Sequence, residues 1–176
     1  MSVGRRLGRL AVGTGKCVCV LSWVSMLAAC SDPNQTEPNI APGEPQVALG
    51  YLQHGDYIAW EPGSDAPVIW GAQGGTWLMP VLRTRGVASP TRVEASLTLS
   101  DGEQLGEFEF VYGLSMTPDE WLETQLFRVP VQHAPPHQFE SVADLYGKPA
   151  LIAVHVSDDA ARSADLAFVI TLVEGD

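Results

Sequence analysis

Apolar and polar side chains alternate strictly over residues 92–99, which constrains the fold of this chain more than any other stretch. After an Asp101-Gly102 pair, Phe108 and Phe110 alternate with glutamates. A period of two places one set of side chains in a core and the other in water, as in a half-buried strand. Asp-Gly supplies the positive φ that a tight turn needs. The two stretches therefore predict a β-hairpin.

The rest of the chain from Val47 onward consists of short apolar runs separated by glycine, proline and aspartate, a pattern typical of all-β domains. The runs at 150–157 and 165–173 are apolar on both faces, so we expect them to lie centrally and to form a hairpin. The fold predicted is an antiparallel β-sandwich of one domain, residues 47–176. Its candidate strands are 47–52, 56–60, 67–71, 76–85, 92–100, 105–112, 126–132, 150–157 and 165–173.

Two segments qualify this pattern. Thr117-Pro118-Asp119-Glu120 resembles a helix start, with an N-cap and a proline at the first helical position, and predicts at most one short helix. Pro80 interrupts the expected strand 76–85. Since proline cannot donate a ladder hydrogen bond, this strand should lie at an edge or carry a bulge there.

Residues 1–29 have the parts of an export signal. Arg5, Arg6, Arg9 and Lys16 precede an apolar run, and the 13 residues from Cys17 to Ala29 are too few for a membrane span of about 20. We therefore interpret this segment as a cleaved signal peptide.

Leu27-Ala28-Ala29-Cys30 closes that segment and resembles the lipobox of bacterial lipoproteins. The resemblance implies cleavage before Cys30 and acylation of its thiol and of the new amino terminus. Several acyl chains give a stable anchor, since each buried methylene contributes about 0.8 kcal/mol. Ser31, by resemblance to lipoprotein sorting in two-membrane bacteria, implies the outer membrane. We expect a lipid-anchored protein of the cell envelope.

The segment from Cys30 to Gln46 contains four prolines and is almost entirely polar. It predicts a flexible tether, which at about 3.1 Å per residue could reach roughly 50 Å. The other two cysteines, Cys17 and Cys19, precede it, so the domain has no thiol and needs no disulfide.

The charge of the chain is strongly acidic. The formal net charge is −11, four of the ten basic residues precede Cys30, and all 21 acidic residues follow it. Such a surface repels phosphate backbones, which argues against nucleic acid as a partner.

A glycine-rich stretch, Gly71-Ala72-Gln73-Gly74-Gly75, is followed by a strand that ends Arg83-Thr84-Arg85-Gly86. This pattern is similar to that of uncharacterised bacterial lipoproteins with an immunoglobulin-like domain, although Thr76-Trp77 stands here in place of an aromatic-histidine pair. The resemblance implies an immunoglobulin-like sandwich in the envelope and no activity. No helix is expected after the glycines, so a turn is favoured over a phosphate site.

Trp77, Arg83 and Arg85 share one face of the expected strand 76–85 and are the candidate binding residues. A tryptophan beside two arginines is a common composition of binding hot spots, here for a protein or glycan partner. Alternatively, the arginines pair with Glu94, Glu107 or Glu109 on neighbouring strands.

An alternative function is a metal-binding or hydrolytic envelope protein that uses His133, His137 and the Asp158-Asp159 loop, with Asp165 close by. The prolines between the histidines prevent a helical zinc pair, and the loop lacks the alternating acidic pattern of calcium sites. We therefore expect no metal, no cofactor and no catalytic residue, and no catalytic motif is present. A non-enzymatic binding module is the favoured interpretation, and a structural spacer of the envelope is the third.

Overall fold

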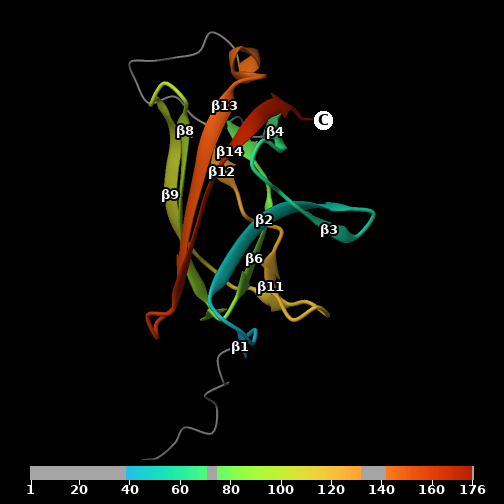
Figure 1. The fold of residues 1–176 in the computed structure, drawn as a ribbon, viewed down its shortest axis with the longest axis vertical. Coiled ribbons are helices and arrows are strands. Elements are labelled where there is room, and N and C mark those ends of the chain that lie inside the picture. The colour runs from blue at the N-terminus through green and yellow to red at the C-terminus, as the bar shows by residue number, and fades with distance from the viewer. Residues whose placement is uncertain (1–38, 71–74, 132–141, 176) are drawn as a thin grey trace, which may run out of the picture. The chain divides into compact units, whose positions relative to one another are not determined.

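A computed structural model describes residues 39–70, 75–131 and 142–175, and these residues are almost entirely β-structure (Figure 1). The strands form a seven-stranded sheet, a five-stranded sheet and a two-stranded ribbon. The all-β sandwich expected from the sequence is confirmed.

The seven-stranded sheet has the order β12-β5-β4-β14-β13-β8-β9. Every neighbouring pair is antiparallel except β14 and β4, which are parallel, so the expectation of purely antiparallel sheets fails at this one pair. The strands of this sheet are β4 (Asp65–Trp70), β5 (Thr76–Leu78), β8 (Thr91–Leu99), β9 (Gln104–Tyr112), β12 (Val129–Pro130), β13 (Pro149–Ser157) and β14 (Ser163–Glu174).

Both predicted hairpins are present in this sheet. β8 pairs with β9 through the Asp101-Gly102 turn, where Gly102 has a φ of 91°. β13 pairs with β14 along its whole length, and the two strands lie in the middle of the sheet. Their apolar composition on both faces therefore indicated the central position correctly.

The five-stranded sheet has the order β10-β11-β6-β2-β3. A ribbon of two short strands, β1 (Asn39–Ile40) and β7 (Ala88–Ser89), completes the strand set. The strands of the five-stranded sheet are β2 (Gln46–Gln53), β3 (Asp56–Ala59), β6 (Val81–Arg85), β10 (Ser115–Met116) and β11 (Leu122–Thr124).

The core lies between the two larger sheets, where β2 contacts β14 and β13. Leu49 and Leu82 of the five-stranded sheet pack in one cluster with the inward side chains of β8, β13 and β14. These inward residues are Val93, Ala95 and Leu97, from the alternating stretch, and Ile152, Val154, Ile170 and Leu172, from the two runs that are apolar on both faces.

The expected strand 76–85 is two strands. β5 ends at Leu78, β6 begins at Val81, and the strands belong to different sheets. Pro80 is buried at the crossing, where its missing N–H breaks no ladder. The proline therefore marks a change of sheet rather than the expected edge or bulge.

The expected helix at Thr117 is a turn between β10 and β11. The Thr117 N–H and Oγ1 donate to the carbonyl oxygen of Trp121, and Glu120 has a φ of 61°, which no α-helix contains. Thr117 therefore closes a turn instead of capping a helix. A four-residue 3₁₀ turn, η1 (Val142–Leu145), precedes β13. Within the described part of the expected strand 126–132, residues 126–131, only β12 forms.

Part of the expected tether belongs to the folded domain. Asn39 and Ile40 pair with β7, Ala41 is fully buried, and its carbonyl accepts a hydrogen bond from the N–H of Gly86. The domain therefore extends to Asn39, whereas residues 30–38 of the tether lie outside the described residues. Among the residues that are described, no helix is long and apolar enough to cross a membrane.

Candidate functional site

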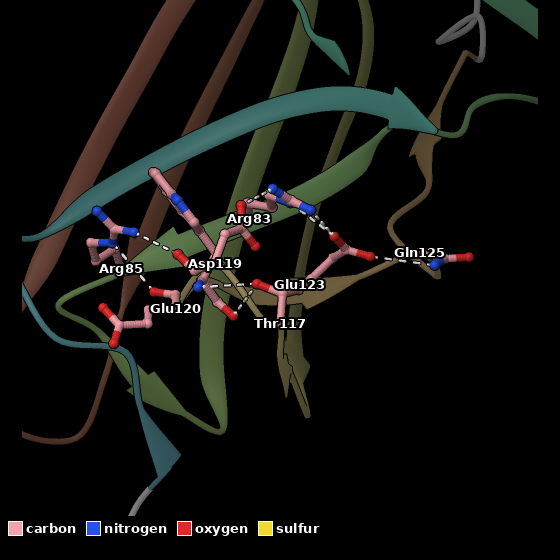
Figure 2. Close-up of polar contacts among 8 residues, drawn as sticks. Arg83, Arg85, Thr117, Asp119, Glu120, Glu123 and Gln125 are labelled. Atoms are coloured by element: carbon pink, nitrogen blue, oxygen red, sulfur yellow. Dashed lines mark hydrogen bonds and ion pairs between the residues drawn. The ribbon is translucent and has the colours of Figure 1, made fainter. Parts of the chain in front are cut away.

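Arg83 is held within the outer surface of the five-stranded sheet (Figure 2). Its Nε and Nη2 each lie 2.8 Å from Oε2 of Glu123, and its Nη1 lies 2.9 Å from Oδ2 of Asp119. The guanidinium also lies 3.9 Å from the centre of the Tyr57 ring. This ring packs directly over Gly50 of β2, where a side chain would clash with it. The Arg83 and Glu123 side chains are only 11% and 12% exposed. Arg83 thus joins β3, β6 and β11 and has little capacity left for a ligand.

Two ionisable groups around Arg83 have shifted pKa values. Burial raises the pKa of Tyr57, although the positive charge of Arg83 opposes the shift. A hydrogen bond from Thr117, assisted by Arg83, lowers the pKa of Asp119. Tyr57 therefore stays a neutral phenol and Asp119 stays a carboxylate at neutral pH, which suits a static ion-pair arrangement.

Arg85 holds the turn that replaced the expected helix. Its Nη2 donates to the carbonyl of Asp119 at 2.9 Å, its Nε donates to that of Glu120, and its guanidinium lies over the Trp121 ring at 4.6 Å.

The glutamates expected as partners of Arg83 and Arg85 lie elsewhere. Glu109 pairs with Arg92, and neither Glu94 nor Glu107 contacts these arginines. The sequence predicted ion pairs for Arg83 but named the wrong carboxylates.

Trp77 lies in β5, in the other sheet from Arg83 and Arg85. It is half-buried and pairs with Ile69 of β4 and Pro130 of β12. Because the chain changes sheets at Pro80, the three candidate residues do not share one strand face.

The residues of the alternative function are only partly described. His133, His137, Cys30 and the glycines at 71–74 lie outside the described residues. Asp158 is turned inward and accepts hydrogen bonds from its own chain, and Asp165 lies 2.8 Å from Nδ1 of His155. Across the described part of the chain, no three histidine, cysteine, aspartate or glutamate side chains could hold one metal ion.

A hollow with a volume of about 590 Å³ lies on the outer face of the seven-stranded sheet, over β14, β13, β8 and β9. The strand register places three rows of side chains across the strands here, of which the first two line the hollow and the third lies beside it. The acidic row comprises Asp165, His155, Glu94 and Glu109. The small row comprises Ala167, Ala153 and Ser96, with Glu107 at its end. The third row borders the hollow on the side of the small row and comprises Val169, Leu151 and Thr98; we call it the apolar row after its first two members. We call the whole surface the outer groove.

The shape of the outer groove follows from side-chain size. Rows two residues apart along a strand are about 7 Å apart, so the short side chains of Ala153, Ala167 and Ser96 leave a trough between two taller rows. Leu151 and Val169 lie directly opposite each other and are 43% and 45% exposed. The groove therefore has an acidic wall and an apolar wall.

Four carboxylates give the groove a strongly negative charge, and few cations offset it. Arg92 pairs with Glu109 at the rim, and His155 lies between Asp165 and Glu94. Glu94 has no hydrogen bond or ion pair within the described ranges, and Asp165 is 80% exposed. Exposed carboxylates beside apolar surface attract a cationic ligand with an aliphatic part, such as a lysine or arginine side chain.

The sequence indicated which side chains share a face of each strand, but not that these strands lie side by side to form the outer groove. The alternation already placed Glu94, Ser96, Glu107 and Glu109 on outward faces, and Leu151, Ala153 and His155 together on one face of their strand. The sequence did not predict that β13 pairs with β8, and this pairing brings the two sets of side chains together.

No protein-family model, no curated protein and no solved structure matches this chain. The immunoglobulin-like and lipoprotein resemblances therefore stay predictions.

Proposed function

We propose that this protein is a non-enzymatic binding module, lipid-anchored in the bacterial cell envelope, that docks a cationic segment of a protein partner in the outer groove. The observation that carries the proposal is the groove itself: four carboxylates around a trough of small residues, with exposed apolar side chains on one side. A cleft lined by charges of one sign focuses its electric field and raises the local concentration of oppositely charged ligands, which favours a cationic partner.

The anchoring half of the proposal depends on Cys30 and its leader. Asn39 is the first residue that the structure describes, and the eight residues from 31 to 38 can span at most about 28 Å. The groove of an anchored protein would therefore work close to the membrane surface.

Replacing Cys30 with serine is expected to abolish acylation, because serine lacks the thiol that accepts the lipid. Incorporation of a labelled fatty acid by bacteria expressing the full chain measures this, with Cys17→Ser as the control. Label retained by the Cys30→Ser protein would contradict the anchor.

Neutralising Glu94 and Glu107 to glutamine is expected to weaken binding of a fluorescent hexalysine peptide about tenfold, since each charge contributes up to about 1 kcal/mol. Anisotropy titrations of the full chain measure the affinity, which should also fall with rising salt. The control is Asp56→Asn with Glu61→Gln, which removes two carboxylates outside the groove. Equal losses in the two variants would mean unspecific attraction and would contradict the proposal.

A further inference from the structure

The three rows of the outer groove also indicate the conformation and sequence pattern of what they bind. The small row crosses β14, β13, β8 and β9 at right angles to the strands, between the acidic row and the apolar row. Neighbouring strands lie about 4.8 Å apart, so the trough is roughly 14 Å long, the length of about four extended residues.

An extended chain lying in this trough would present successive side chains to opposite walls. Side chains of a β-like segment alternate with a period of two, so one set would point to Glu94 and Asp165 and the other to Leu151 and Val169. An α-helix fits less well, because its side chains follow a period of 3.6 and so do not alternate between two opposite walls.

We infer, on the basis of the proposed function, that the occupant is an extended segment of a partner protein in which lysine or arginine alternates with apolar residues. The charge of the acidic row selects the basic positions, and the exposed pair Leu151 and Val169 selects the apolar positions. The aliphatic stems of the basic side chains lie along Ala153 and Ala167, with their charges at the carboxylates. A second copy of this acidic chain is disfavoured as the occupant by repulsion.

Two blocked, fluorescent hexapeptides of identical composition test this inference: Lys-Val-Lys-Val-Lys-Val and Lys-Lys-Lys-Val-Val-Val. The alternating peptide is expected to bind the full-length protein about tenfold more tightly, because only it can satisfy both walls at once. Equal affinities would overturn the inference and leave the proposed function standing. If neither hexapeptide binds and hexalysine also fails to bind, both this inference and the proposed function are overturned.

The double variant Leu151→Ser, Val169→Ser tests whether these two side chains bind the apolar residues of the alternating peptide. It is expected to reduce the affinity of the alternating peptide to that of the block peptide and to leave the block peptide unchanged. Leu126→Ser is the matched control, because Leu126 is 69% exposed and lies outside the groove. Retention of the tenfold preference in the double variant would overturn the assignment of the wall, and circular dichroism shows whether that variant is folded. If it is not, Val169→Ser alone provides the same comparison.

Discussion

Replacing Gly106 with alanine is expected to lower the free energy of unfolding by about 3 kcal/mol, the upper part of the range for overpacking. A Cβ at this position would lie 2.0 Å from the carbonyl oxygen of Pro130 and 3.0 Å from its carbonyl carbon. These are backbone atoms of β12, so no side-chain rotation can relieve the clash. Gly106 therefore allows β12 and β9, the first and last strands of the seven-stranded sheet, to approach each other closely.

Urea denaturation of the full chain measures this effect, and Gly113→Ala is the matched control. A Cβ on Gly113 would meet no heavy atom within 4 Å, so the same chemical change should cost nothing or stabilise by about 0.4–1 kcal/mol through the unfolded state. Equal unfolding midpoints for the two variants would show that β12 and β9 do not need the close approach.

Alternation predicted the strand at 92–99 and the faces of its side chains, because burial of one face is a local property of the sequence. Its inward residues all lie in the core, whereas the run at 150–157 is apolar on both faces and did not show which face would be inward. The strand order was not predictable, because nothing in either segment specifies that β8 lies beside β13. The outer groove depends on that pairing. The sequence therefore identified the outward residues of each strand but did not predict that they form one site.

The arginines show a second limit of local pattern. Arg83 and Arg85 were expected to pair with carboxylates on neighbouring strands, yet their partners come from the turn after Thr117 and from β11. That turn resembled a helix start, because threonine, proline and acidic residues also suit tight turns. The distinction depends on tertiary contacts, here the hydrogen bonds and ring stacking of Arg85 on Glu120 and Trp121.

Asp158 accounts for the other large stability effect. The sequence analysis named Asp158 only in the alternative, metal-binding function. In the structure both of its oxygens are occupied by the protein. Oδ1 accepts hydrogen bonds from the N–H groups of Ala160 and Arg162, and Oδ2 accepts from Ala88 N–H and Arg162 Nε, each within 3.1 Å. The side chain is 2% exposed. One carboxylate therefore links the β13–β14 hairpin to β7.

Replacing Asp158 with asparagine is expected to destabilise the domain by about 3 kcal/mol at pH 7, because hydrogen bonds to a buried charge are strong and an amide cannot accept at both ends. Asp159→Asn, the same change at the exposed next residue, should cost less than about 0.5 kcal/mol. Thermal and urea unfolding of both variants measure the difference. Equal stabilities of the two would mean that the carboxylate does not hold the loop.

The pH dependence of the stability difference between wild type and Asp158→Asn shows whether the carboxylate charge or the packing of the side chain causes the loss. Burial raises the pKa of Asp158, but the hydrogen bonds from Ala88, Arg162 and Ala160 and the charge of Arg162 outweigh it, so the pKa lies below the ordinary value of about 3.8. A lowered folded-state pKa stabilises the fold above the unfolded value, and this stabilisation is lost as the pH falls through the folded value. The gap between wild type and Asp158→Asn should therefore be constant above about pH 5 and should narrow below about pH 4. A gap that stays constant down to pH 2 would assign the effect to packing instead of to the carboxylate charge.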